Sequence, residues 1–423
     1  MISFLKRFFA ELNDNFNYAV LRNFENLPEK IDSRDIDILI LEKDLKAIRL
    51  LIYNLAVQKN CSVLYTNQDN QFLTVVIMDK QQQVFQLDLQ YNFAWMGIDL
   101  LDENVVLKHR VFNGRIYHLD KMFTFLPKYL YCRILGADYP AKYTHVQAEA
   151  MQNYGNEINM LLSELSCGGG SIEYWNSHNK WQLRWWSFLS VLRRRPCRAI
   201  RHISRFVAIY IMHIFTRRGL MISFTGPDGC GKTTVIDLLS ERLAVNPPKL
   251  FHFRPSLLPN LGEVGAKAKL TKTVDRNFDS PHRAKKKNVL SSLIRLGYYS
   301  LDYVIGYWLK VFPLRQRKHI VFFDRYFTDI IVDHERSSIF LAHRFIAPLR
   351  YLLPRCKYNF FFRVAPETIL KRKQELTGDA IERIYNRMEY LAARDKHCFW
   401  IDNNGSPEDA VRQILYVIAG KNK

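Results

Sequence analysis

The stretch that most constrains this chain of 423 residues is residues 221–234, which read MISFTGPDGCGKTT. A short apolar run, typical of a buried strand, ends there in a glycine-rich turn that leads into a helix-forming sequence. Residues 226–233 match the pattern G-x-x-x-x-G-K-[ST] without a mismatch. In this context the pattern predicts a loop whose backbone N–H groups surround nucleotide phosphates at a helix N-terminus. The alternative is a loop of this shape that has lost its ligand.

The side chains of this loop have separate expected roles. Lys232 is expected to reach the β- and γ-phosphates of ATP, and the Thr233 hydroxyl to ligate Mg²⁺. Asp228 is a further catalytic candidate within the loop. The residues predicted to bind the nucleotide are Gly226, Gly229, Gly231, Lys232, Thr233 and Thr234. ATP and Mg²⁺ are therefore the predicted cofactors.

A loop of this kind also needs a carboxylate near the metal ion, at the end of a neighbouring apolar strand. Residues 319–326, HIVFFDRY, supply Asp324, which we predict to be this metal-site residue. Arg325 follows directly and is expected to face an anionic acceptor. The alternative is that Asp324 and Arg325 form a structural pair at the strand end.

From residue 220 to the C-terminus, strands rich in Val, Ile and Phe alternate with helical segments. This rhythm predicts an α/β domain over residues 219–423, with a parallel sheet flanked by helices. The sequence GPDGCGKTT, followed some ninety residues later by DRY, resembles the thymidylate kinase-like P-loop kinases over roughly residues 219–420. The resemblance implies transfer of a phosphoryl group from ATP to a small anionic acceptor.

Two further arginines take their roles from this resemblance. In the family, an Arg-Pro pair after the second strand grips the phosphate of the acceptor, and Arg254 and Pro255 stand in that place. The family also has a basic lid helix, which the segment 366–376 resembles. Arg372 in this segment would close on the transferring phosphoryl group.

The chain departs from thymidylate kinases after DRY. Residues 327–336, FTDIIVDHER, replace the Ser- and Gln-containing run that recognises thymine, and residues 267–287 insert eight Lys or Arg. In these features the chain resembles thymidylate kinase-like proteins found with bacterial surface-polysaccharide synthesis genes, which implies a phosphorylated or sugar-type acceptor. One alternative is a kinase of dTMP or another nucleoside monophosphate with an appended regulatory domain. The other is a non-catalytic, nucleotide-switched module in defence or scaffolding.

Residues 1–165 have a different pattern, which predicts an α+β domain. Asp35 and Asp37 stand two residues apart on a predicted strand and so face one side, while Asp88 is near the end of a later strand. Three converging carboxylates suit a two-metal nucleotidyl-transfer site, so we predict them as Mg²⁺ ligands. The arrangement resembles the DNA polymerase β-like nucleotidyltransferase fold over roughly residues 15–130. A degenerate copy and ordinary strand-end carboxylates are the alternatives.

One part of the nucleotidyltransferase pattern is missing. That family has a Gly-Ser or Gly-Gly pair before the Asp-x-Asp strand, where this chain has Leu21, Arg22 and Asn23. Arg22 is the residue that could replace the pair as a phosphate ligand. A second, nucleotidyltransferase activity beside the kinase is therefore left open.

Residues 166–218 form the predicted connector between the two domains. Glycines at 168–170 interrupt the periodicity, and residues 180–218 hold ten Lys or Arg and no Asp or Glu, interleaved with tryptophans at 181, 185 and 186. This composition predicts basic amphipathic helices that contact an anionic membrane surface. The alternatives are helices packed between the domains with solvated arginines, and, least favoured, contact with nucleic acid.

The composition of the whole chain agrees with an anionic partner. Lys and Arg number 61 against 41 Asp and Glu, which gives a formal net charge of +20. The seven cysteines show no metal-ligand spacing and are typical of reduced thiols. No stretch reaches eighteen uninterrupted apolar residues, and the closest, residues 206–215 in the connector, spans only ten. We therefore expect a cytoplasmic protein, with peripheral contact at the inner membrane face, and leave its oligomeric state open.

Overall fold

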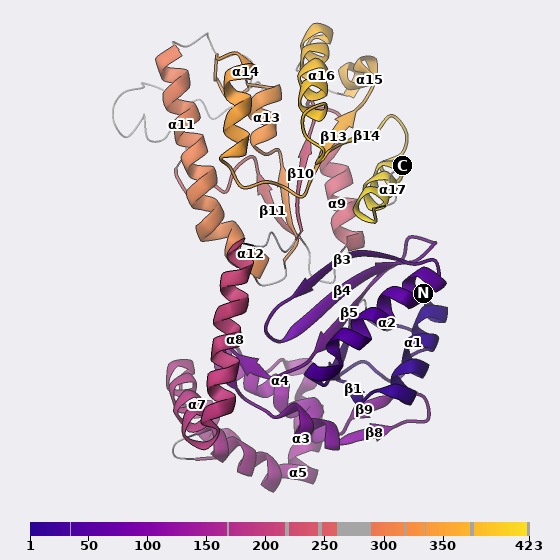
Figure 1. Ribbon diagram of the computed structural model, residues 1–423, viewed down its shortest axis with the longest axis vertical. Coiled ribbons are helices and arrows are strands. Elements are labelled where there is room, and N and C mark those ends of the chain that lie inside the picture. The colour runs from indigo at the N-terminus through magenta and orange to yellow at the C-terminus, as the bar shows by residue number, and fades with distance from the viewer. Residues whose placement is uncertain are drawn as a thin grey trace. The chain divides into compact units, whose positions relative to one another are not determined.

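The computed structural model describes residues 1–33, 35–166, 169–215, 220–243, 248–259, 289–316, 319–334, 336–372 and 376–420. The chain divides into two compact units, Met1–Arg217 and Arg218–Lys423, which we call unit 1 and unit 2 (Figure 1). The described connector residues, 166 and 169–215, belong to unit 1. The basic insertion at 267–287 lies outside the described residues.

Unit 1 is built around a mixed sheet with the strand order β3-β4-β5-β2-β1-β9-β8. The pairs β2–β5 and β1–β9 are parallel, and the other neighbouring pairs are antiparallel. A separate short hairpin pairs β6 with β7. The strands are β1 (Tyr18–Val20), β2 (Asp35–Ile40), β3 (Ser62–Gln68), β4 (Phe72–Met78), β5 (Val84–Gln90), β6 (Ala94–Trp95), β7 (Ile98–Asp99), β8 (Arg110–Phe112) and β9 (Tyr117–Leu119).

Helices cover the two faces of this sheet. The helices of unit 1 are α1 (Ile2–Asn15), η1 (Glu42–Asp44), α2 (Leu45–Gln58), α3 (Glu103–Lys108), α4 (Lys121–Leu135), η2 (Ala141–Tyr143), α5 (Thr144–Leu165), α6 (Ile172–Ser177), α7 (Lys180–Arg194) and α8 (Pro196–Phe215). Ile38 of β2 packs with buried residues of α1 and α2, whereas Leu39 packs with those of α4 and α5. Because side chains alternate along a strand, Asp35 and Asp37 share the face of Leu39, towards α4.

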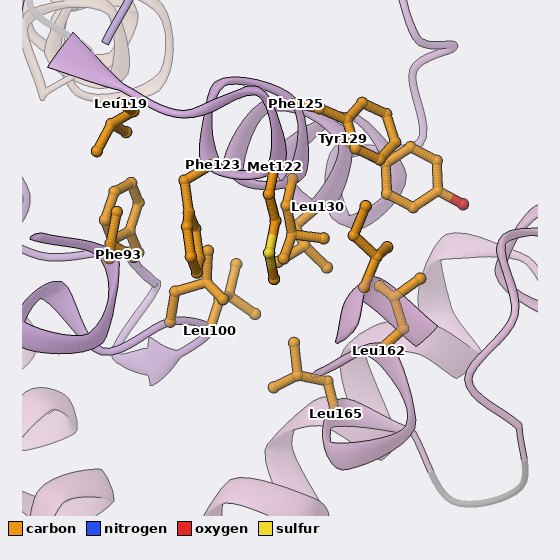
Figure 2. Packing of buried hydrophobic residues seen from close by; sticks show 14 of the residues in the cluster. Phe93, Leu100, Leu119, Met122, Phe123, Phe125, Tyr129, Leu130, Leu162 and Leu165 are labelled. Carbon is orange, nitrogen blue, oxygen red and sulfur yellow. The ribbon is translucent and has the colours of Figure 1, made fainter. Parts of the chain in front are cut away.

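The core between the sheet and α4 is rich in large apolar side chains. Phe123, Phe125 and Leu130 of α4 meet Leu162 of α5 in this cluster (Figure 2). All four side chains are at most 1% exposed. Helix α4 is thereby fixed over the sheet, which sets the position of its remaining, more polar face.

The connector helices pack onto the rest of unit 1. Helix α7 contacts α4 and α5, and α8 contacts α7 and β7. Arg198 of α8 forms ion pairs with Asp99, with Asp102 at 2.5 Å and with Glu103 at 2.7 Å. Sequence reasoning about packed connector helices predicted solvated arginines. The structure shows Arg198 paired instead, because its acidic partners come from residues 99–103, while Arg193, Arg194 and Arg201 are exposed.

Unit 2 is an α/β fold with a five-stranded sheet in the order β11-β12-β10-β13-β14. All its neighbouring pairs are parallel, which confirms the predicted parallel sheet flanked by helices. Strand β10 is central and buried along its whole length, as its apolar sequence predicts. The strands are β10 (Met221–Thr225), β11 (Lys249–His252), β12 (Val321–Asp324), β13 (Tyr358–Arg363) and β14 (Cys398–Asp402).

The helices of unit 2 follow the strands in alternation. They are α9 (Lys232–Leu243), α11 (Val289–Gly306), η4 (Tyr307–Val311), α12 (Phe312–Gln316), α13 (Phe327–Val332), α14 (His343–Ile346), η5 (Ala347–Tyr351), α15 (Pro366–Arg372), α16 (Gly378–Ala392) and α17 (Pro407–Ile418). Helix α9, which opens at the glycine-rich loop, packs against α17 (Figure 1). Across the described part of both units, no helix has the length and apolar character needed to cross a membrane.

Candidate functional site

The glycine-rich loop leaves the carboxyl end of the central strand β10 and enters α9 at Lys232. Gly229 and Gly231 have φ angles of 84° and 85°, in the left-handed region that disfavours other residues. A Cβ atom on Gly231 would also lie 2.6 Å from Nδ2 of Asn403. The glycines of the motif are therefore required by the backbone path, and the loop opens a helix whose N-terminus favours an anion.

Lys232 points into this loop rather than into solvent. Its side chain is buried, and Nζ donates hydrogen bonds of 2.9 Å to the carbonyl oxygens of Gly226 and Pro227. Thr233 and Thr234 follow in the first turn of α9 with exposed side chains. The ammonium group thus lies inside the loop where it can reach phosphate oxygens.

The loop is also held by a residue that sequence reasoning missed. Asn403, directly after β14, donates from Nδ2 to the carbonyl of Cys230 at 2.7 Å. The side chain of Asn403 is 3% exposed, so this contact is fully buried. Arg372 lies close by, because its Nη1 would be 3.7 Å from a Cβ atom on Gly231. The structure therefore brings Arg372, the predicted lid arginine, close to the glycine-rich loop.

Asp324 ends β12, next to β10 in the sheet, with Phe224 as its cross-strand partner. Its Oδ2 lies 3.4 Å from Nδ1 of His252. Its Oδ1 is buried, and no hydrogen-bond partner for it occurs in the described residues. A buried carboxylate oxygen of this kind suits the hydration shell of a cation, so the site fits the predicted Mg²⁺.

Arg325 does not pair with Asp324 but with two other carboxylates. Its Nη1 donates to Asp329 at 2.9 and 3.1 Å, and its Nη2 donates to Asp228 of the glycine-rich loop. Burial alone would lower the pKa of Arg325, but Asp329 and Asp228 hold it above its usual range. Its φ of 70° is unusual for a residue with a side chain. Arg336 donates to the second oxygen of Asp228, so two arginines converge on one loop carboxylate.

Arg254, the other predicted acceptor ligand, is engaged differently. Its guanidinium is 5% exposed and pairs at 2.9 Å with Asp302, which is fully buried. It also donates to the carbonyl of Leu258 at 3.0 Å. Asp302 in turn accepts from the backbone N–H groups of Leu257 and Leu258. These contacts hold the turn after β11 together, and the acceptor role of Arg254 stays a prediction.

In unit 1 the predicted carboxylates are neighbours, but a guanidinium lies among them. Asp37 and Asp88 are cross-strand partners on β2 and β5. Arg22 donates from Nη2 to Asp35 at 3.0 Å and from Nε to Asp37. Burial raises the pKa of Asp37, and Arg22 opposes that shift. Asp88 accepts hydrogen bonds from Thr74 and from Gln86.

Within the described residues of either unit, no group of three or more His, Cys, Asp or Glu side chains could hold a metal ion. The positive charge beside Asp35 and Asp37 comes from Arg22. The role of Asp35, Asp37 and Asp88 as Mg²⁺ ligands therefore stays a prediction, and we derive no metal-dependent step from them.

The connector presents two of its tryptophans to solvent. Trp181 and Trp185 of α7 are 68% and 60% exposed. Trp186, one residue on, packs against the core formed with α4 and α5. The guanidinium of Arg184, also on α7, lies over the rings of Trp95 and Trp181. The helix thus has one face in the core and an aromatic face outside.

No protein-family model matches this sequence, and no curated protein matches it. Among solved structures, the chain is similar to a thymidylate kinase from Ehrlichia chaffeensis, with 19% identity and a TM-score of 0.34, over 48% of this chain and 99% of that one. It is also similar to a thymidylate kinase from Candida albicans, with 18% identity and a TM-score of 0.35, over 48% of this chain and 92% of that one. Similarities at this level identify neither a substrate nor a reaction for this chain.

Proposed function

We propose that unit 2 is an ATP-dependent kinase that transfers the γ-phosphoryl group to a phosphorylated or sugar-type acceptor. The observation that carries this proposal is the loop at the end of β10, which holds the buried ammonium of Lys232, while Asp324 ends the neighbouring strand β12. A positive group fixed within such a loop can stabilise the charge that develops on the transferring phosphoryl oxygens.

Four side chains at or near the loop have proposed parts in this reaction. Lys232 binds the β- and γ-phosphates, and Arg372 adds a second cation beside Gly231. Thr233 and Asp324 would hold Mg²⁺, which supplies charge neutralisation between the phosphates when bound. In-line transfer then needs only an acceptor oxygen placed opposite the leaving group.

The contacts of Asp228 with two arginines support an anionic acceptor. An anionic acceptor would compete with Asp228 for Arg325 and Arg336, which now share that carboxylate. The carboxylate of Asp228 could then also accept a hydrogen bond from an acceptor hydroxyl. A polyhydroxyl phosphate has both groups, which supports a precursor of a surface polysaccharide as the acceptor.

A screen of acceptors tests this function. The full-length protein is incubated with ATP, Mg²⁺ and one acceptor at a time from nucleoside monophosphates, sugar phosphates and polyol phosphates, and ADP release is measured. We expect turnover with a sugar or polyol phosphate. Preference for dTMP would favour the nucleoside monophosphate kinase with an appended domain, and ATP binding without turnover of any acceptor would favour the nucleotide-switched module.

A nucleotidyltransferase step in unit 1 is the second candidate, supported by the neighbouring positions of Asp37 and Asp88. The ion pairs of Arg22 favour instead a copy of the fold without that activity. Release of pyrophosphate from nucleoside triphosphates that is lost in the double variant Asp35→Asn/Asp37→Asn would support the transferase. No release with any triphosphate and acceptor would support the degenerate copy.

We further propose a cytoplasmic protein whose connector touches the inner face of an anionic membrane. The exposed rings of Trp181 and Trp185 support this, since tryptophan favours the headgroup region. The charge available for lipid is smaller than the sequence suggests, because Arg198 and Arg205 already pair with carboxylates of unit 1. Weak, reversible contact is therefore expected.

A further inference from the structure

Asn403 holds the glycine-rich loop from a distant part of the chain. It lies 173 positions after Cys230, directly after β14, and its Nδ2 donates to the Cys230 carbonyl at 2.7 Å. The backbone N–H of Asn403 donates to the carbonyl of Arg363, the last residue of β13, at 3.0 Å. The side chain is buried. It therefore reaches the loop as a donor that is fixed to the sheet.

The carbonyl that Asn403 contacts belongs to the peptide unit between Cys230 and Gly231. In a trans peptide unit the C=O and N–H bonds point in opposite directions. A donor that holds the Cys230 oxygen towards Asn403 therefore directs the N–H of Gly231 away from Asn403. The carbonyl of Gly231 accepts from the N–H of Val235 at 3.3 Å, so this N–H lies at the N-terminus of α9, where an anion is favoured.

Gly231 does not select this orientation by itself. Its φ is 85°, and glycine adopts positive and negative φ with similar ease. If the peptide unit rotated and the φ of Gly231 changed sign, the Cys230 oxygen would point where the N–H now points. A carbonyl oxygen there would repel phosphate oxygens. A contact from outside the loop is therefore needed to keep the donor orientation.

The other end of the Asn403 amide is not satisfied. Its Oδ1 is buried, and none of the residues that the structure describes provides a hydrogen-bond partner for it. An unpaired buried acceptor is destabilising. The amide therefore contributes less to the stability of the fold than its contact with Cys230 suggests, which favours a role in function.

From these contacts we propose that Asn403 is a positioning residue, which holds the Cys230–Gly231 peptide unit so that the N–H of Gly231 faces the β-phosphate of a bound nucleotide. This inference rests on the function proposed for unit 2, because it requires nucleotide phosphates in the loop. Asn403 acts through the loop backbone and does not touch the nucleotide. Loss of its amide should therefore weaken the binding of the β-phosphate and leave the contacts of the base and ribose unchanged.

Binding of two nucleotides to the full-length protein tests this role. ADP has a β-phosphate and AMP lacks it, and each is titrated by calorimetry in the presence of Mg²⁺. Asn403→Leu keeps the approximate size of the side chain and removes the donor. We expect the Kd for ADP to rise about tenfold and the Kd for AMP to change less than about twofold. A side chain with only a structural role would change both Kd values alike or neither.

Two further variants complete the test. Asn404→Leu makes the same change at the next residue, which is exposed and accepts from the N–H of Ala365, and it should leave the ratio of the two Kd values unchanged. Asn403→Ala removes the donor with a smaller side chain and should match Asn403→Leu, which keeps the test valid if the leucine prevents folding.

The outcomes separate this role from the function on which it rests. If the wild type binds ADP and the Asn403 variants bind it equally well, or if they weaken ADP and AMP by the same factor, the positioning role is overturned and the proposed kinase is not. Failure of the wild type to bind ADP would overturn the function proposed for unit 2 and this inference with it.

Discussion

The two units pair their acidic and basic groups in opposite ways. In unit 2, Arg325 is bound by Asp329 and Asp228, which leaves Asp324 with a buried oxygen for another ligand. In unit 1, Arg22 contacts both Asp35 and Asp37 itself. The nearest arginine therefore occupies the strand-end carboxylates of unit 1, whereas in unit 2 it is engaged by other carboxylates.

The largest expected effect concerns Arg254 of unit 2, which pairs with a buried carboxylate. Arg254→Met leaves the fully buried Asp302 without its cation. We expect the free energy of unfolding of unit 2 to fall by about 3–5 kcal/mol, the range for one broken member of a buried pair. Chemical denaturation of the full-length protein measures it. A stable variant with a raised acceptor KM would instead make Arg254 an acceptor ligand.

Removal of Arg22 from unit 1 should lower the free energy of unfolding by less, and the loss should depend on pH. Arg22→Gln leaves Asp37 buried without its main partner, and since Arg22 is 38% exposed we expect a loss of only about 1–3 kcal/mol at pH 8. Burial already raises the folded-state pKa of Asp37, and loss of Arg22 raises it further. The protonated form is therefore favoured by folding, and the loss should shrink as the pH falls towards 5.

Denaturation curves of the wild type and of this variant at the two pH values give the measurement. Arg7→Gln, which removes an exposed arginine paired with Glu11 on α1, is the matched control and should change stability little at either pH. An equal loss for Arg22→Gln at pH 5 and pH 8 would mean that the ionised form of Asp37 is not what Arg22 stabilises.

Variants of Arg325 and Arg336 test whether these two arginines bind an anionic acceptor. If an anionic acceptor displaces Asp228 from these arginines, Arg336→Met should raise the acceptor KM about tenfold and leave the KM for ATP nearly unchanged. Arg325→Met should act in the same direction, with some loss of stability because Asp329 is buried. Steady-state kinetics with ATP and with the acceptor as the varied substrate measure the two KM values separately. Equal changes in both KM values would indicate a role in holding the glycine-rich loop.

The smallest expected effect concerns the connector. Trp181→Ser/Trp185→Ser removes two exposed rings and should weaken binding to phosphatidylglycerol vesicles about tenfold at low salt. Trp186→Ser removes a partly buried ring that packs against the core and should destabilise the fold instead. Sedimentation with anionic and neutral vesicles measures the difference. Wild-type binding that is absent, or equal for both lipids, would leave α7 and α8 as packing helices.

The features that could be predicted from the sequence are local or follow from strand order. The glycine-rich loop is encoded in consecutive residues, with Gly229 and Gly231 at the positions where the backbone requires glycine. Asp324 could be predicted because the ends of buried parallel strands meet at one edge of the sheet. The connector helices followed from composition, but Trp185 outside and Trp186 inside could not be distinguished without the position of α4 and α5.

The features that could not be predicted depend on contacts between distant residues. Asp228 and Arg336 are separated by 108 positions, and Arg198 is 96 positions from Asp102. No local pattern marks such pairs, since each residue alone resembles a solvated surface charge. Arg22 is a candidate phosphate ligand by its sequence position, yet its ion pairs with Asp35 and Asp37 depend on the antiparallel pairing of β1 with β2. Asn403 carried no signal beyond its position after the last strand.

The central claim is that Lys232 in its loop catalyses phosphoryl transfer from ATP. Using the best acceptor from the screen, transfer of labelled γ-phosphate is compared between the wild type, Lys232→Ala, and Lys249→Ala, which changes an exposed lysine of β11. Lys232→Ala alone should lose at least ~3 kcal/mol of transition-state stabilisation. This loss corresponds to a drop in kcat/KM of more than ~100-fold. Equal transfer by the wild type and Lys232→Ala would contradict it.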